Sequence, residues 1–141
     1  MIGLGLNIWR NQAGSRLGPE LVVNGDFSNG ATGWTLGTNW AVSAGLLVAT
    51  AAAQDSFTKT TAGVVIAGKS YQIKIDAPAY TSGGWKVLLE GGANVFGDKT
   101  GSGSFTAIVP VTVTGSLYIW ANALLTAAFD NVSVREVLPP T

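Results

Sequence analysis

The chain has 141 residues, enough for one domain with a single continuous core. Its eight lysines and arginines equal its eight acids in number and are scattered, so no basic stripe is available to bind a nucleic-acid backbone. Because the sequence lacks Cys and His, disulfides, Cys/His zinc sites and histidine-dependent catalytic triads are excluded.

The first 19 residues differ from the rest and are predicted to form an extended N-terminal arm and linker. In residues 1–9 apolar side chains occupy every second position, the period of a strand with one apolar face. Residues 10–19 are polar and Gly-containing, as linkers are. The arm either pairs with an edge of its own sheet or adds a strand to another subunit. In the second case the partner-contacting residues are Ile2, Leu4, Leu6, Ile8 and Trp9.

The folded domain is expected to open immediately after this arm. Residues 21–23 predict a short apolar strand, and the Asn24-Gly25 pair predicts a turn with positive φ. Phe27 and Trp34 stand on either side of a polar, Gly-rich turn. Both are predicted to be buried anchors of the opening stretch.

Short β-type segments separated by Gly-rich and polar turns make up the rest of the chain, and no segment has the apolar period of a helix. The clearest half-buried strand is 71–76, where apolar and polar residues alternate. Many short strands at roughly 8–12-residue spacing predict a sandwich or jelly roll. The expected segments are 40–42, 46–48, 56–61, 64–66, 71–76, 85–90, 105–109, 111–113 and 117–121, followed by a closing strand at 129–134.

The predicted fold class is therefore all-β, a jelly-roll β-sandwich with an N-terminal extended arm. Residues 1–19 are expected to be the arm and linker, residues 20–137 the sandwich, and residues 138–141 a C-terminal tail.

Two end motifs carry a family resemblance. The opening NGDFSNG…GW, residues 24–34, and the closing FDNVSV, residues 129–134, resemble the ends of carbohydrate-binding-module-like jelly rolls, which also occur in virion proteins of tailed bacteriophages. The resemblance covers about residues 20–137. It implies the fold more specifically than it implies any ligand.

The same resemblance raises the question of a calcium ion, which related modules often hold near the opening and closing strands. The matching acids are Asp26 and Asp130, but where the family often has an acid directly after the Phe, this chain has Ser28. Because Ca²⁺ requires several carboxylates and carbonyls, we expect no metal and no other cofactor. Asp26 is instead expected to cap its own turn, and Asp130 to pair within the closing hairpin.

No catalytic residue is predicted. Glycoside hydrolysis needs two carboxylates facing each other across a cleft, and most of the acids here flank turns or lie on polar strand faces. We therefore expect a protein that is not an enzyme.

Aromatic residues outside the predicted core pattern are the candidates for glycan or interface contacts. Tyr118 and Trp120 share one strand face, opposite Leu117 and Ile119, so one of the two sets must face outward unless both faces are covered. The segment 78–84 is predicted to be a contact loop. The alternative is that these aromatics pack in the core or in an interface. The candidates are Trp40, Tyr80, Trp85, Tyr118 and Trp120.

The composition favours a protein that is built into an assembly. Only 11% of the residues are charged and 47% are hydrophobic, at a net charge of zero, which favours self-association or attachment to a partner. The apolar runs are too short to span a membrane.

With an arm on a jelly roll of this length, the chain resembles capsid cement proteins of short-tailed phages. That resemblance implies a decoration subunit on the outer surface of the virion capsid, which binds the major capsid protein. Zero net charge, an apolar composition and sheet edges favour self-association, as a homodimer or other symmetric oligomer. The alternative is a carbohydrate-binding module of a tail or fibre protein that recognises host-surface glycans.

Overall fold

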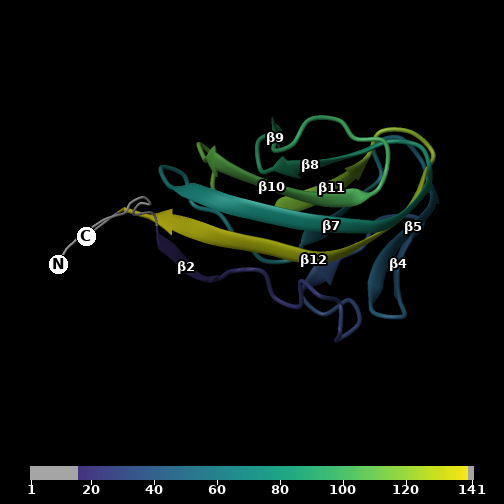
Figure 1. Cartoon of the computed structure of the whole chain (residues 1–141), viewed down its shortest axis with the longest axis horizontal. Helices are drawn as coiled ribbons and strands as arrows, with labels where there is room; N and C mark the ends of the chain where they lie inside the picture. The colour runs from purple at the N-terminus through teal and green to yellow at the C-terminus, as the bar shows by residue number, and fades with distance from the viewer. Residues whose placement is uncertain (1–15, 140–141) are drawn as a thin grey trace.

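The computed structural model describes residues 16–139, which form two antiparallel sheets packed against each other (Figure 1). No helix occurs within this range, so the predicted all-β sandwich is confirmed. One sheet contains β2 (Arg16–Glu20), β4 (Trp40–Ser43), β5 (Leu46–Ala52), β7 (Ser70–Ser82), β10 (Gly103–Pro110) and β12 (Leu125–Leu138). The other contains β3 (Trp34–Thr35), β6 (Phe57–Thr60), β8 (Trp85–Leu89), β9 (Ala93–Asn94) and β11 (Leu117–Ala121).

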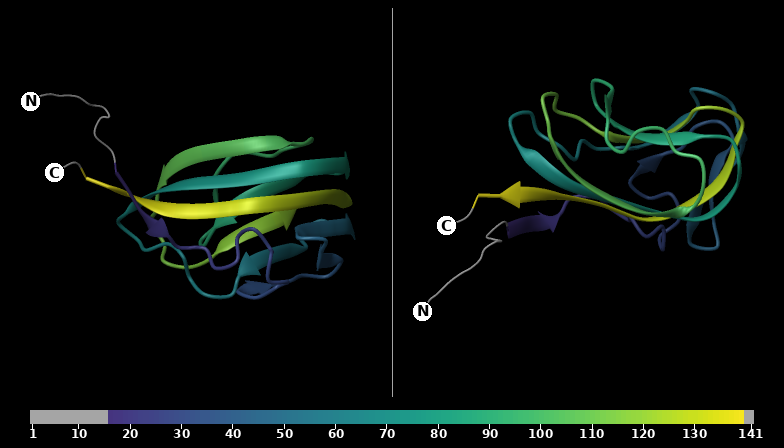
Figure 2. Two further views of the ribbon diagram at one scale, coloured as in Figure 1. Left: turned by 60° about the horizontal axis from the view of Figure 1, so that its bottom comes forward. Right: turned by 45° about the horizontal axis from the view of Figure 1, so that its top comes forward.

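The chain crosses between the two sheets at almost every connection from β5 onward, which is the pattern of a jelly roll. The six-stranded sheet has the order β10-β7-β12-β5-β4, with β2 also paired to β12. The five-stranded sheet has the order β3-β6-β11-β8-β9. The long strands β7 and β12 lie side by side along the sandwich (Figures 1 and 2).

Alternation along β7 explains why it folds as a strand with one buried face. Tyr71, Ile73 and Ile75 are almost fully buried against the second sheet, while the residues between them face outward. The predicted half-buried strand at 71–76 is thus confirmed, although β7 continues to Ser82.

Aromatic rings fill the centre of the core. Trp85 is fully buried and meets Phe129 and Phe105 edge-on, with ring centroids 5.1 and 5.3 Å apart. Trp40 packs on the same Phe129 at 5.9 Å. Each such pair contributes about 0.5–1.5 kcal/mol beyond the burial of its area.

The opening strand lies earlier in the chain than predicted. Residues 21–23 are not a strand; β2 instead spans Arg16–Glu20, so four residues assigned to the linker belong to the sandwich. β2 pairs antiparallel with the C-terminal end of β12, and Leu17 lies opposite Val137. The chain therefore enters and leaves the domain at one end of the sandwich (Figure 2). The predicted arm contacts Ile2, Leu4, Leu6, Ile8 and Trp9 lie outside the described residues.

The carboxylate of Glu20 lies at the end of this strand and binds backbone N–H groups on both sides of it. It accepts hydrogen bonds from the backbone N–H groups of Leu21 and Val22, both at 3.2 Å, and from the N–H of Val134 at 2.8 Å. The N–H of Leu21 also donates to the carbonyl of Val134 in β12 at 3.0 Å, so contact with the sheet continues one residue past β2 before the chain turns away, although the composition of residues 21–23 is typical of a strand.

The opening turn is held by one amide side chain. Asn24 has a positive φ of 57°, as predicted for this turn. Its Nδ2 donates to the carbonyls of Gly30 and Thr32, both at 2.9 Å, and its Oδ1 accepts from the N–H of Asn29 at 2.9 Å. These bonds fix the shape of the Gly-rich loop that follows.

This loop places the two predicted anchors in the core and brings the two ends of the domain together. Phe27 is 1% exposed and Trp34 6%, and their rings lie 5.1 Å apart, so the prediction that both are buried is confirmed. The carbonyl of Gly25 accepts a hydrogen bond from the N–H of Val132 in the closing strand at 2.9 Å. The opening and closing motifs are thus neighbours in space.

Candidate functional site: an aromatic face on the five-stranded sheet

β11 divides its side chains between the core and the outer surface. Leu117, Ile119 and Ala121 are fully buried between the sheets. Tyr118 and Trp120 lie on the opposite side of the strand and are half-buried on the outer face of the sheet. Of the two sets of side chains that the sequence pattern allowed, the aromatic pair is the outward one.

Phe57, which was not among the predicted site residues, joins this pair from the neighbouring strand. β6 and β11 are paired so that Phe57 stands opposite Trp120, and the two rings stack with centroids 4.7 Å apart and planes 11° from parallel. Phe57 also meets Tyr118 edge-on at 5.2 Å. We call these three side chains, Phe57, Tyr118 and Trp120, the aromatic face.

The polarity of β6 is the reverse of what its composition suggests. Thr58 and Thr60 are buried, and Phe57 faces outward. The buried hydroxyls are satisfied, because Thr58 accepts from the N–H of Gly37 at 3.3 Å and Thr60 from the N–H of Leu117 at 3.1 Å. The alternation of Phe57 with the threonines predicts that they lie on opposite faces of the strand. It does not predict which of the two faces packs against the core.

Carboxylates fix the polar edges of two of the rings. Glu90 accepts from the Tyr118 hydroxyl with both oxygens, each at 3.0 Å. Asp55 accepts from Nε1 of Trp120 at 3.1 Å. Burial, followed by the hydrogen bond to Glu90 and its negative charge, raises the pKa of Tyr118 above its ordinary value. The phenol therefore remains a neutral donor, and the protein's own carboxylates hold both rings in place.

Two lysines approach the rings. Nζ of Lys59 lies 5.7 Å from the centroid of Tyr118, and Nζ of Lys86 lies 6.0 Å from the centroid of Trp120. These are cation–π distances, worth about 0.5–1 kcal/mol each at an exposed site. With the two carboxylates, the lysines surround the apolar rings with charge of both signs.

A hollow of about 340 Å³ opens beside the aromatic face. Its walls are mostly apolar, and the single charged group among them is the carboxylate that binds Tyr118. The lining residues are Phe57, Leu88, Leu89, Glu90, Gly91, Gly92, Tyr118 and Trp120.

The other three aromatic candidates are not exposed at this surface. Trp40 is 5% exposed and Trp85 is fully buried, so both predicted contact sites are wrong; both rings belong to the core. Each buried indole is satisfied, since Trp40 donates to the hydroxyl of Ser56 at 3.1 Å and Trp85 to the carbonyl of Gly101 at 3.2 Å.

Tyr80 lies in a strand. The predicted contact loop at 78–84 is also wrong for most of its length, because β7 extends to Ser82. Tyr80 is half-buried against the core, and its hydroxyl donates to the carbonyl of Gly83. The Gly and Ser residues that suggested a loop mark only the tight turn at its end.

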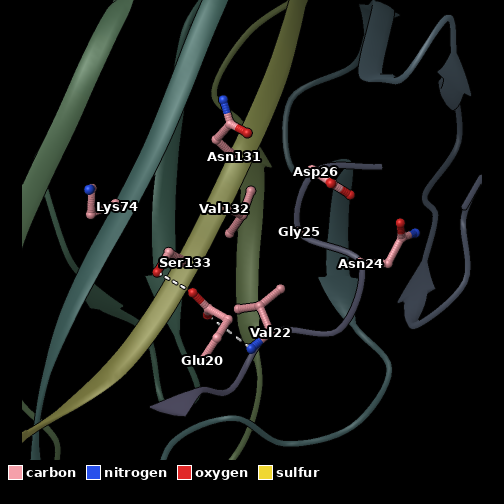
Figure 3. A pocket seen from close by; sticks show the side chains of 9 residues that line it. All are labelled: Glu20, Val22, Asn24, Gly25, Asp26, Lys74, Asn131, Val132 and Ser133. Atoms are coloured by element: carbon pink, nitrogen blue, oxygen red, sulfur yellow. Dashed lines mark hydrogen bonds between the residues drawn. The ribbon is translucent and has the colours of Figure 1, made fainter. Parts of the chain in front are cut away.

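A second, polar hollow of about 430 Å³ lies where the opening turn meets β12 (Figure 3). Glu20 points toward Ser133 and bonds its hydroxyl, as well as the backbone N–H of Val134, so this carboxylate is already occupied by the protein. Asp26 lies apart from Glu20 in the same view. The lining residues are Glu20, Val22, Asn24, Gly25, Asp26, Lys74, Asn131, Val132 and Ser133.

The two acids considered for calcium have local partners. Asp26 accepts from both the N–H and the hydroxyl of Ser28, at 3.1 and 2.8 Å, and these bonds lower the pKa of this exposed carboxyl. This is the turn-capping role predicted for it. Asp130 accepts from the N–H of Asn131 at 2.8 Å, at a bulge where Asn131 has a φ of 51°. Residues 16–139 contain no group of three or more His, Cys, Asp or Glu side chains that could hold a metal ion.

No protein-family model matches the chain, and no curated protein matches it. In the part of the chain that the structure describes, no helix is long and apolar enough to cross a membrane.

Proposed function

We propose that this protein is a non-enzymatic structural protein of a tailed-phage virion, a cement or decoration subunit that binds the capsid shell through the aromatic face. The observation that carries the proposal is the cluster of Phe57, Tyr118 and Trp120, half-exposed beside an apolar hollow.

The arrangement of the rings favours a protein partner. Sugar stacking needs an open ring face, but Trp120 is stacked on Phe57 on one side and has Lys86 near its ring. What the cluster offers a partner is ring edges and a hollow large enough for an apolar side chain. Interfaces are typically built from such aromatic anchors inside a polar rim.

The polar groups around the rings support binding over catalysis. Asp55 and Glu90 are each committed to an aromatic side chain. The donors lie 3.0–3.1 Å from the carboxylate oxygens, which is hydrogen-bond distance. Each carboxylate therefore positions the ring that it binds. A neutral, apolar composition and the resemblance to phage cement proteins, including that of a Bordetella short-tailed phage, support the choice of a capsid as the partner.

Depleted particles test this proposal. Expanded shells of the phage that carries the chain, stripped of this subunit, would be incubated with the wild-type protein and with Leu88→Asp, which puts a charge into the hollow. Leu124→Asp is the matched control, since Leu124 is 64% exposed and does not line the hollow. We expect Leu88→Asp to reduce particle occupancy by about tenfold or more and Leu124→Asp to leave it unchanged. Equal occupancy for all three proteins would refute the aromatic face as the capsid-binding surface.

A carbohydrate-binding module is the second candidate, favoured by the position of Tyr118 and Trp120 side by side with carboxylates at their edges. A glycan array probed with the wild type and Trp120→Ala distinguishes the two. Glycan binding that Trp120→Ala abolishes, with no binding of the wild type to shells, would establish the second function in place of the first.

A further inference from the structure

β10 is an unprotected edge strand. It forms the end of the six-stranded sheet and pairs only with β7 among the described strands. Its eight residues contain no charge, no Gly after the first position and no Pro before the last. Ile108 on this strand is 58% exposed.

The alternation of hydrogen-bonding residues along β10 shows which backbone groups point toward the open edge. Val111 donates its N–H to the carbonyl of Lys69 on the β7 side, and the pairing of β10 with β7 runs without a register shift. Hydrogen-bonding residues alternate along an antiparallel strand. Ser104, Thr106 and Ile108 therefore direct their N–H and C=O groups away from β7, toward the open edge.

The other edges of the described sheets carry the usual protections. β3 and β9 have two residues each, and β4 has four. β2 has Pro19 and the charges of Arg16 and Glu20. Short length, Pro and charge all block pairing with another chain. β10 is long and has neither an interior Pro nor a charge.

We propose that two copies of this chain pair through β10, antiparallel and about a two-fold axis at Thr106, to form one continuous sheet across the dimer. In this register Thr106 lies opposite Thr106 of the second copy, and Ser104 lies opposite Ile108. All three residues then exchange both of their backbone hydrogen bonds across the axis, as a hydrogen-bonded antiparallel pair does. Moving the axis one residue toward the C-terminus would bring Pro110, which has no N–H, into a bonding position.

The side chains suit this self-pairing. On the outer face Thr106 meets its own copy, and cross-strand Thr pairs are favourable. On the inner face the half-buried Phe105 lies opposite the small Ala107 of the second copy, so a large side chain meets a small one. No like charges oppose each other, because the strand has none. A two-fold axis needs a surface complementary to itself, and β10 meets that condition in both backbone and side chains.

This inference is independent of the proposed function. β10 belongs to the six-stranded sheet, whereas the aromatic face lies on the outer side of the five-stranded sheet. Both surfaces can be occupied at once.

Sedimentation of the full chain over a concentration series tests the dimer. Ile108→Lys adds a charge to the edge, and Thr106→Pro removes an edge N–H that does not bond β7. Because each dimer loses two main-chain bonds in Thr106→Pro, we expect its dissociation constant to rise by roughly tenfold or more. Ile66→Lys is the control, since Ile66 is 53% exposed and lies outside β10. Circular dichroism and melting confirm that each variant is folded. A wild type that is monomeric throughout, or folded variants that dimerise as the wild type does, would overturn the proposal.

Cysteine cross-linking tests the register, because the native chain has no Cys. Thr106→Cys should form a disulfide-linked dimer under mild oxidation, as its mate is the same residue. Ile108→Cys should cross-link poorly alone but efficiently when mixed with Ser104→Cys. If Ile108→Cys alone links as well as Thr106→Cys, the two-fold axis does not pass through Thr106 and the proposed interface is wrong.

Discussion

Gly25 marks the closest approach between the opening turn and the closing strand. A Cβ added at this position would lie 2.1 Å from the carbonyl oxygen of Val132, well inside contact distance. The same two residues share a backbone hydrogen bond of 2.9 Å, so neither can move without breaking it. At this point the fold requires a residue without a side chain.

Gly25→Ala should therefore destabilise the domain by about 1–3 kcal/mol or more, through overpacking against backbone. Gly18→Ala is the matched control: a Cβ there meets only Glu136 at 3.6 Å, an ordinary contact. We expect the control to change the free energy of unfolding by less than about 0.5 kcal/mol. Urea unfolding measures both values. Equal stabilities for the two variants would show that the turn can relax away from β12.

Tyr118 provides a pH-dependent test of the aromatic face. Burial and Glu90 raise the pKa of its hydroxyl in the folded state. A raised pKa means that the folded state keeps the proton longer than the unfolded state does. The stability from this bond is then fully present below about pH 10, the ordinary value for Tyr, and is lost as the pH rises through the folded value.

The measurement is ultraviolet titration of tyrosinate in the wild type and in Tyr118→Phe. The difference between the two curves isolates one of the three tyrosines, and its midpoint should lie above 10. In Glu90→Gln the midpoint should move back toward the ordinary value, since the acceptor loses its charge. A difference curve centred at or below 10 would contradict both the burial of the Tyr118 hydroxyl and its contact with Glu90.

At the scale of residues, the sequence predicted burial where a motif supplied the context. Phe27 and Trp34 are anchors as expected. Tyr118 and Trp120 were selected together, but Phe57 was missed because it begins a Thr-rich strand whose threonines face the core. Which face of a strand is buried depends on the strands beside it. Here the neighbour of Phe57 is Trp120, a residue distant in sequence, so the contact could not be predicted locally.

At the scale of elements, alternation identified most strands but placed their ends poorly, and the predictions of strands at 64–66 and 111–113 were wrong, since of these residues only Val65 forms an isolated bridge, with Gly115. β7 was predicted, but its last residues were assigned to a loop. Gly83 and Gly84 indicate a turn, but the local sequence does not show how many of the preceding residues belong to that turn. β2 was misplaced for a different reason. Arg16–Glu20 is a strand because it pairs with the far end of the chain, Leu17 lying opposite Val137, and this long-range contact is not revealed by the composition of the segment.

This placement of β2 gives a prediction for truncations. Removing residues 1–9 leaves β2 and Glu20 intact, so the melting temperature should stay within error of the full chain. Removing residues 1–20 deletes β2 and leaves the part-buried N–H of Val134 without its carboxylate acceptor, a loss of about 1–3 kcal/mol before the ladder is counted. Thermal unfolding of both truncations checks this. Under the proposed function, removing residues 1–9 should also lower particle occupancy, as expected for an apolar arm that adds to a partner.

At the scale of the whole molecule, the two candidate surfaces lie on different sheets. The aromatic face is formed by β6 and β11 of the five-stranded sheet, and the open edge is β10 of the six-stranded sheet. A chain with zero net charge and few charged residues has little electrostatic repulsion to keep copies apart. Pairing through β10 would thus give a dimer that carries two aromatic faces.

A subunit with two binding faces can attach to a repeating surface at two points, and linking two weak sites raises avidity by about 10²–10⁴ where the geometry allows both to engage. Ile108→Lys leaves every residue of the aromatic face unchanged, yet it should lower shell occupancy at limiting protein concentration. Ile66→Lys carries the same added charge outside β10 and should bind as the wild type does. Binding isotherms on depleted shells, read against sedimentation of the same proteins, make the comparison. If Ile108→Lys becomes monomeric but keeps full occupancy, each aromatic face binds alone and the dimer does not contribute to attachment. If its occupancy falls in step with its loss of dimer, the strand that joins two copies also determines how firmly they hold the shell.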